Sequence, residues 1–290
     1  MVSGDTAGMA VQTAQKSSPS PADKMLIRAW LHSKSENTRR AYERFALALL
    51  AHAGKPLADV TLPDLQNWSD SLGGAASSRR LAMAAVKSLT AFGAETEMLT
   101  RNVGQALRLD RERDSLHERI LSQVQVATLI DMEKCPRRRA LLRLLYVMGL
   151  RISEACRLTW RDVTRRQQGG VASVFGKGNK TRPVEIPAKL FKELVALRVD
   201  TEPKAPLVPG HNGGPLSHDA AHRIVKRAGK RAGLPSSFSA HWLRHAHVSH
   251  SLDRGAHVHA VQRSVGHASL ATTTRYAHVQ DGDGSGKFLD

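Results

Sequence analysis

A tyrosine near the end of the sequence follows two histidines and an arginine at spacings that favour chemistry on a phosphate ester. Residues 239–279 contain H-W-L-R-H, with His241 and Arg244 three residues apart, and then G-H-A-S-L-A-T-T-T-R-Y, with Tyr276 nine residues after His267. Residues three apart share one face of a helix and can grip one anionic group together. A phenol with a pKa of about 10 is a poor nucleophile until a base and a positive field assist it. The histidines can supply the base, and the arginines the field.

Two more cations lie at predicted junctions earlier in the chain. Arg151, in G-L-R-I-S-E, follows a glycine that ends one predicted helix and precedes a new helix that begins near Ser153. Lys177 lies at or near the tip of a predicted hairpin, because V-A-S-V-F and R-P-V-E-I-P flank the turn-like string G-K-G-N-K-T. That string lacks the spacing of a phosphate-binding loop and is followed by a strand, so we exclude nucleotide binding.

Taken one at a time, these residues have ordinary structural interpretations, and the charge of the chain favours the functional ones. A histidine-bearing helix is usually a solvated face, a tyrosine near a chain end usually packs, and a hairpin lysine is usually solvated. Forty-three Lys and Arg against 26 Asp and Glu give a formal charge of +17 and a pI near 10.5, which indicates a polyanionic partner. With only 4% aromatic residues, duplex binding through phosphates is favoured over stacking on single strands.

Other classes of protein are disfavoured by what the sequence lacks. Two cysteines, Cys135 and Cys156, make neither a C-x-x-C pair nor a disulfide scaffold, and indicate a reducing compartment. His241 and His245 have the spacing of metal ligands, but no carboxylate or cysteine nearby completes a site, so we expect neither a metal nor another cofactor. The sequence has no apolar run of about 18 residues, no secretory signal, and basic residues spread along its length. These features predict a cytoplasmic protein with no membrane partner.

The elements that must position these residues divide the chain into five parts. We expect a disordered leader at 1–20, a helical N-terminal domain at 21–113, a charged linker at 114–121, a second domain at 122–280 and a flexible tail at 281–290. Caps, prolines and glycines predict helices at 21–31, 36–53, 61–72, 77–92, 122–132, 136–147, 187–199, 219–231 and 240–252, a further helix that begins near Ser153, and a short turn at 102–109. The predicted helix 219–231 carries a basic surface suited to DNA phosphates: His222, Arg223, Lys226, Arg227, Lys230 and Arg231.

With these motifs in view, the chain resembles the tyrosine recombinases, the phage integrases and Xer-type enzymes, over roughly residues 21 to 280. The resemblance rests on G-L-R-I-S-E, G-K-G-N-K-x-R, H-x-L-R-H and G-H-x-S-x-x-T-T-x-x-Y, which occur in the family's order and spacing. It implies a mainly α, two-domain clamp. An N-terminal helical SAM-like core-binding domain would precede a helical catalytic domain with a small antiparallel β-sheet, the tyrosine recombinase catalytic fold.

The resemblance also implies a role for each candidate residue. Tyr276 would attack the scissile phosphate to leave a 3′-phosphotyrosine, without metal or ATP, while His241 takes the phenol's proton. Lys177 would protonate the departing 5′ oxygen, a task that contributes about 10² to 10⁴ in rate. Arg151 and Arg244 would hold the non-bridging oxygens, because a guanidinium can donate two hydrogen bonds to a phosphate. His267 would donate a hydrogen bond to the phosphate.

The resemblance implies a site-specific recombinase that cuts and rejoins double-stranded DNA as a homo-tetramer on two sites. Two features depart from the family's pattern: Ala155 stands where leucine is common, and the segment after Tyr276 is only 14 residues long. Whether that tail is exchanged between subunits, and whether an accessory DNA-bending protein takes part, stay open. Two alternatives also stay open, a type IB topoisomerase-like enzyme that relaxes DNA and a catalytically silent DNA-binding regulator.

Overall fold

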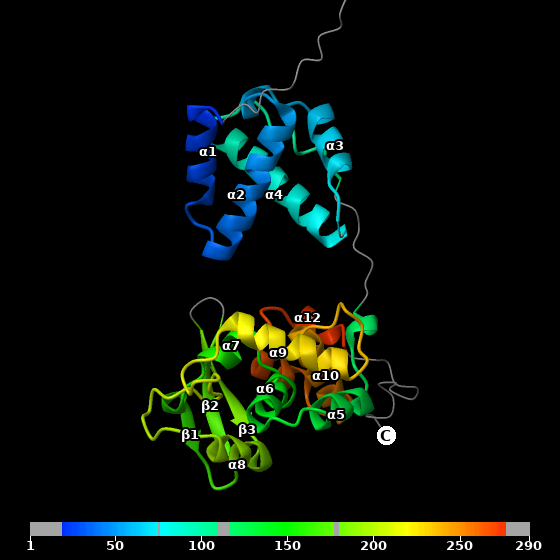
Figure 1. Cartoon of the computed structure of the whole chain (residues 1–290). Coiled ribbons are helices and arrows are strands. Elements are labelled where there is room, and N and C mark those ends of the chain that lie inside the picture. The colour runs from blue at the N-terminus through cyan, green and yellow to red at the C-terminus, as the bar shows by residue number, and fades with distance from the viewer. Residues whose placement is uncertain (1–18, 75, 109–115, 177–179, 277–290) are drawn as a thin grey trace, which may run out of the picture. The chain divides into compact units, whose positions relative to one another are not determined.

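The computed structural model describes residues 19–74, 76–108, 116–176 and 180–276. The chain divides into two compact units, 1–113 and 114–290, and each is described by itself. The expectations for residues 1–18 of the leader, for 114–115 of the linker, for Lys177 and for the tail 281–290 lie outside the described residues. Figure 1 labels the elements of both units.

The described residues of the N-terminal unit form four α-helices, and capping signals in the sequence mark the ends of several of them. Ser20 and Asp23 form a capping box at the start of the first helix, and Thr61 and Asp64 form another at the third. Gly54 ends the second helix in the left-handed region, with φ of 66°. The helices are α1 (Pro21–Leu31), α2 (Glu36–Ala53), α3 (Leu62–Ser71) and α4 (Ala76–Glu95), with a 3-10 helix at Leu57–Asp59.

One apolar core joins these four helices, and a stretch of turns after α4 is held by side chains. Leu49, Leu65 and Leu89 are fully buried, one each from α2, α3 and α4. The short turn predicted at 102–109 is present, since the described residues 102–108 form hydrogen-bonded turns. Their backbone carbonyls accept hydrogen bonds from the Lys87 side chain, which takes the place of a helical ladder.

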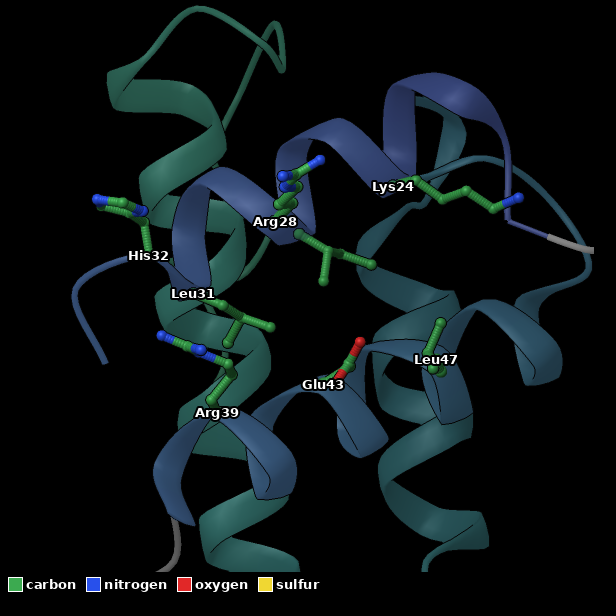
Figure 2. A pocket seen from close by; sticks show the side chains of 8 residues that line it. Lys24, Arg28, Leu31, His32, Arg39, Glu43 and Leu47 are labelled. Atoms are coloured by element: carbon green, nitrogen blue, oxygen red, sulfur yellow. The ribbon is translucent and has the colours of Figure 1, made fainter. Parts of the chain in front are cut away.

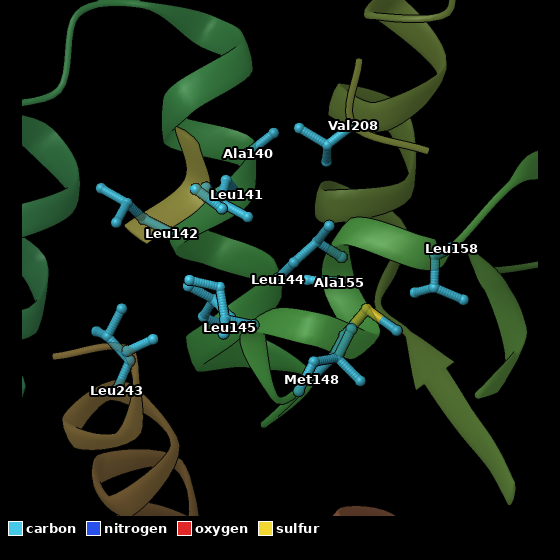
Figure 3. Close-up of a cluster of buried hydrophobic side chains, with 14 of the residues drawn as sticks. Ala140, Leu141, Leu142, Leu144, Leu145, Met148, Ala155, Leu158, Val208 and Leu243 are labelled. Atoms are coloured by element: carbon cyan, nitrogen blue, oxygen red, sulfur yellow. The ribbon is translucent and has the colours of Figure 1, made fainter. Parts of the chain in front are cut away.

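The C-terminal unit packs eight helices around a leucine-rich core, within the described residues. Helix α6 carries four arginines, but four of its leucines are fully buried, and it packs against α8, α9 and α10 (Figure 3). The helices are α5 (Gln123–Asp131), α6 (Pro136–Val147), α7 (Ile152–Arg157), α8 (Ala188–Ala196), α9 (His218–Arg231), α10 (Ala240–Asp253), α11 (Val258–Val265) and α12 (Leu270–Thr274), with 3-10 helices at His117–Arg119 and Trp160–Asp162.

A three-stranded antiparallel sheet completes this unit, in the order β1 (Val163–Arg165), β2 (Gly170–Phe175) and β3 (Thr181–Ile186). Strands β2 and β3 form the predicted hairpin, with Ala172 opposite Val184 and Val174 opposite Arg182. Buried residues alternate with exposed ones along β3, so one face of the sheet packs on the core. Strand β1 was not predicted, because three residues, Val-Thr-Arg, carry too short a pattern to recognise.

The expectation of a mainly helical fold with a small antiparallel sheet is therefore confirmed. Among the described helices, none is both long and apolar enough to cross a membrane.

Candidate active site

Helix α10 carries the buried candidate residue Arg244. The helix begins after Ser239, whose backbone is extended as an N-cap requires, although its side chain makes no capping hydrogen bond. The Arg244 side chain is 6% exposed and donates from its two terminal nitrogens to the carbonyls of Gly149 and Val265, each at 2.6 Å. Burial, and then the nearby Arg151, lowers its pKa to about 10, so it stays charged at neutral pH.

Arg151 lies at the N-cap of α7 and is held by the acidic residue one turn into that helix. Its backbone N–H donates to Oε2 of Glu154 at 2.9 Å, and its Nη1 donates to Oε1 of the same residue at 2.8 Å. Its Nη2 lies 3.4 Å from the carbonyl of Gly266. The side chain is still 33% exposed, so it is both oriented by the protein and accessible to a ligand.

Glu154 is a buried carboxylate between two arginines. Arg182, on β3, donates to both of its oxygens, at 3.0 Å and 2.9 Å, and also donates from Nε to the carbonyl of Ser264 at 2.6 Å. Burial by itself would raise the pKa of Glu154, but the hydrogen bonds from Arg182 and Arg151 outweigh it and lower the pKa overall. Glu154 is therefore ionised at neutral pH and fixes both guanidinium groups.

Tyr276 closes the site from the end of α12. Its side chain is 4% exposed and packs with Val248, Val261 and Val265 in a small apolar cluster. The phenol oxygen lies 2.5 Å from Nδ1 of His245, within hydrogen-bond distance. Gly266 has a φ of 69° and turns the chain, so that a second imidazole lies against the phenol ring.

That second imidazole belongs to His267, whose ring stacks on Tyr276 with centroids 6.4 Å apart and planes 18° apart. Its Nδ1 lies 2.9 Å from the hydroxyl of Thr273, the buried residue of α12, so the ring is oriented by the helix that leads to the tyrosine. Its neighbour on the other side of the phenol, His245, also stacks on the ring, at 5.7 Å.

Both imidazoles beside the phenol are neutral at physiological pH. Burial lowers the pKa of His245 to about 4, with further contributions from His241 and Arg119. Burial and then the charges of Arg244 and Arg151 lower the pKa of His267 to about 4. The pKa of His241 is lowered as well, by burial and then by Arg244 and Arg151. Neutral imidazoles can accept a proton, which is what a phenol needs in order to attack.

A hollow of about 580 Å³ opens beside these imidazoles. Its lining is polar and partly basic, and it includes two histidines of α10, His241 and His245. The lining residues are Glu118, Arg119, Pro235, Ser237, Ser239, His241, Trp242 and His245. His241 lies on the exposed surface of α10, and its ring is 6.4 Å from that of His245, one turn further along. An anionic group entering this hollow would meet His241 before it meets the phenol.

Of the six residues predicted from sequence, the structure describes five and brings four of them around the turn at Gly266: Arg151, Arg244, His267 and Tyr276. His241 lies on the same helix as Arg244 and lines the hollow, while the phenol contacts His245 instead. Lys177 lies outside the described residues.

Three contributors to the site were not predicted: Glu154, Arg182 and His245. Each lies inside a motif that was recognised, in R-I-S-E, in G-K-G-N-K-x-R and in H-x-L-R-H respectively. The motifs were therefore the available signal, and the roles within them depend on contacts between segments up to 115 residues apart.

No cluster of three or more His, Cys, Asp and Glu with a metal-binding arrangement occurs in the described parts of the chain. The N-terminal unit has a separate hollow of about 360 Å³ between α1 and α2 (Figure 2). Its apolar floor includes Ile27, Leu31 and Leu47. Basic side chains outnumber the single carboxylate around it: Lys24, Arg28, His32 and Arg39 against Glu43.

Comparisons with known proteins identify the family of the chain. The family described as "Phage integrase family" matches residues 119–283 of the chain. Tyrosine recombinase XerC of Mycobacterium leprae (strain TN) is 33% identical over 85% of this chain and 89% of its own length. Tyrosine recombinase XerC of Nitrobacter winogradskyi (strain ATCC 25391) is 42% identical over 144 residues, which are 48% of this chain and 45% of that relative.

The fold has counterparts among solved structures. The XerH site-specific recombinase, solved bound to its difH substrate in a pre-cleavage complex, is 19% identical, with a TM-score of 0.70 over 89% of this chain and 91% of that one. The chain spans about half of the Nitrobacter relative and most of the Mycobacterium one. The family match, the full-length relative and the shared fold lead to one conclusion: the chain belongs to the phage integrase family, the tyrosine recombinases.

Proposed function

We propose that this chain is a site-specific recombinase that cleaves and rejoins duplex DNA through a 3′-phosphotyrosine intermediate. The observation that carries the proposal is the phenol of Tyr276, 2.5 Å from a neutral imidazole and next to a turn on which Arg151 and Arg244 converge. A nucleophile beside a base, with cations fixed nearby, is the arrangement that attack on a phosphate diester needs.

In the proposed reaction, the Tyr276 oxygen forms a bond to the scissile phosphorus and the bond from phosphorus to the 5′ oxygen breaks. The phenol's proton passes to an imidazole, and the 5′ oxygen takes a proton, a role proposed for Lys177 on the basis of its motif. One ester replaces another, so the bond energy is retained, and rejoining is the same step in reverse. No nucleotide is consumed in this scheme.

The arginines would oppose the negative charge that builds up on the phosphate. Arg244 keeps a pKa of about 10 and so remains a cation, and its position is already set by two backbone carbonyls. Arg151 is the more exposed of the two and is suited to direct contact with a non-bridging oxygen. Because both are oriented before DNA arrives, little reorganisation is needed during the reaction.

Two imidazoles compete for the role of proton acceptor. The sequence motif assigns it to His241, whereas the phenol lies against His245. We propose that His245 holds the phenol in the DNA-free chain, and that His241, on the exposed side of α10, approaches the phosphate together with His267. In this arrangement attack requires Tyr276 to leave its buried position, because a 4% exposed phenol cannot reach a phosphate in the hollow.

Both units would bind the duplex. We assign 21–113 as the core-binding domain, 114–121 as linker, 122–280 as catalytic domain and 281–290 as tail. On α9, Lys226 donates to the carbonyl of Ser236, and Arg231 pairs with the buried Glu133. The other four basic residues of that helix are exposed and remain for phosphates: His222, Arg223, Arg227 and Lys230. We further propose a homo-tetramer on two DNA sites, as recombination of two duplexes requires.

The test is to incubate the purified chain with DNA that spans the flanks of its own gene, beside Tyr276→Phe, and to look for a protein–DNA adduct that survives denaturation. An adduct in the wild type and none in the variant, which still binds DNA, supports the nucleophile. An adduct in both variants would contradict it. Joined products from two different DNA molecules distinguish recombination from the topoisomerase-like alternative, which yields none.

A further inference from the structure

The carbonyl end of α11 is where three arginines meet. Helix ends leave their last carbonyls without partners inside the helix, and the helix dipole places negative charge there. Here the three successive carbonyls 264, 265 and 266 accept from Arg182, Arg244 and Arg151, at 2.6, 2.6 and 3.4 Å. Two of these arginines are the proposed phosphate ligands. The third, Arg182, has no role in the proposed reaction so far.

Arg182 joins this helix end to the buried carboxylate of Glu154. Its Nη1 and Nη2 donate to the two oxygens of Glu154, and its Nε donates to Ser264. The same carboxylate receives the backbone N–H and Nη1 of Arg151. Since Glu154 is only 1% exposed, removing one of its cationic partners would leave charge poorly compensated in the interior. The position of Arg151 therefore depends on Arg182 through a shared carboxylate.

The guanidinium of Arg182 is enclosed and fully engaged. The side chain is 12% exposed, and all three of its nitrogens donate within the protein, so it is not presented to a phosphate as Arg151 is. A Cβ added at Gly176 would lie 3.2 Å from its Nη1, and one added at Gly266 would lie 3.2 Å from its Nε. Gly176 and Gly266 directly precede Lys177 and His267 in sequence, so Arg182 lies next to the residues that lead into both.

From this arrangement we propose that Arg182 is a positioning residue for DNA cleavage. It fixes Glu154, and through it Arg151, against the carbonyl end of α11 that leads into His267. The inference rests on the proposed function. A lysine cannot replace it, because one ammonium cannot reach both carboxylate oxygens and the Ser264 carbonyl in the planar geometry that a guanidinium provides.

The experiment measures single-turnover cleavage at saturating DNA for wild type, Arg182→Lys and Arg182→Gln. We expect both variants to cleave about 10²-fold more slowly, the size of effect that a misplacement of about 1 Å causes, with DNA affinity within threefold of wild type. The matched control is Arg143→Lys, since Arg143 also pairs a part-buried guanidinium with a carboxylate, that of Glu193, between α6 and α8. Melting temperatures of the two lysine variants show whether general stability differs.

A second measurement separates positioning of Arg151 from general damage. DNA with a methylphosphonate at the scissile position lacks one charged oxygen and so needs less help from Arg151. We expect the defect of Arg182→Lys to shrink at least tenfold on that DNA, and Arg182→Lys with Glu154→Gln to be no slower than the worse single variant. An equal defect on both DNAs, or wild-type cleavage by Arg182→Lys, would overturn the inference while leaving the proposed function intact. A wild-type chain that forms no adduct on any DNA would overturn both.

Discussion

The arginines and the tyrosine of the site are held by different kinds of contact. Arg244 and Arg182 are bound by backbone carbonyls and a buried carboxylate, and both are largely enclosed. Tyr276 has a hydrogen-bond contact with His245, stacks with His245 and His267, and lies in a small apolar cluster after a five-residue helix. The arginines are therefore held mainly by charge-assisted hydrogen bonds, and the phenol mainly by ring stacking and apolar packing.

This difference assigns separate tasks to the two sides. Fixed cations stabilise charge most effectively when they need no reorganisation during the reaction. A nucleophile that must approach phosphorus, and later withdraw, benefits from weak anchoring in the DNA-free state. The comparison therefore predicts that changes on the arginine side damage both stability and cleavage, and that changes on the tyrosine side alter cleavage with little loss of stability.

The largest effect on both properties is expected for Arg244→Ala. It leaves the carbonyls of Gly149 and Val265 without their buried donors, each costing about 1 to 3 kcal/mol, and it removes a cation from the phosphate site. Cleavage should fall by about 10³-fold, the upper range for losing one such donor. Urea denaturation and single-turnover cleavage measure the two losses. Unchanged stability would mean that Arg244 is not anchored as described.

Comparing His245→Gln with His241→Gln tests which imidazole holds the Tyr276 phenol and which one acts in cleavage. If His245 holds the phenol in its buried position, its substitution should release Tyr276 and change cleavage by less than tenfold, in either direction. Substitution of His241, on the exposed side of α10, should slow cleavage by about 10² to 10⁴-fold, as loss of a positioned acid or base does. The rate of nitration of Tyr276 by tetranitromethane, mapped by mass spectrometry, reports exposure of the phenol. The reverse ranking would make His245 the proton acceptor during the reaction.

Gly266→Ala tests whether the turn at Gly266, rather than helix α11, fixes the positions of the three arginines. Its φ of 69° strains any other residue by about 1 to 2 kcal/mol, and the added methyl group would lie 3.2 Å from Arg182. The matched control is Gly233→Ala, at φ of 68° with no atom within 4 Å of the added Cβ. Both should lose similar stability, but only Gly266→Ala should slow cleavage, by about tenfold or more. Equal cleavage by the two variants would contradict the role of the turn.

The sequence predicted most of the helices, because their caps are local signals. The capping box at Ser122 and Gln125, the proline at the start of α6 and the glycine at 54 each mark a predicted boundary within a few residues, whereas α11 and α12 were not predicted. The turn predicted at 102–109 is present in the described residues 102–108, but its hydrogen bonds from the Lys87 side chain could not be inferred from periodicity. Local pattern predicts elements, and long-range contacts decide the exceptions.

Local sequence patterns are limited in the same way at the candidate active site, where long-range contacts decide which residues meet. The resemblance to tyrosine recombinases implied that Arg151, Arg244, His267 and Tyr276 lie together, but the contact between the phenol and His245 was not predicted. His241 and His245 lie one helical turn apart, and their difference depends on how α12 folds back after the turn at Gly266. Arg182 is likewise an ordinary strand residue until Glu154 and Ser264 are brought to it from segments 28 and 82 residues away.

A pH dependence of stability tests the burial of the imidazoles independently of DNA. His245, His247 and His267 have pKa values lowered to about 4 by burial, against about 6.5 in an unfolded chain. Below pH 6.5 the unfolded chain therefore binds more protons than the native one, so the free energy of unfolding should fall as the pH is lowered from 6.5 towards 4.

Urea denaturation at pH 7.5, 6.0 and 5.0, at constant ionic strength, measures this slope. His247→Gln should lessen the loss between pH 6.5 and 5, because one of the three protonations is removed. His247 packs against Gly149, beside the carbonyl that holds Arg244, so some stability at pH 7.5 should be lost in exchange. A slope that stays the same in this variant would mean that the histidines on the tyrosine side alone cause the acid sensitivity, and that the arginine side is the less pH-dependent of the two.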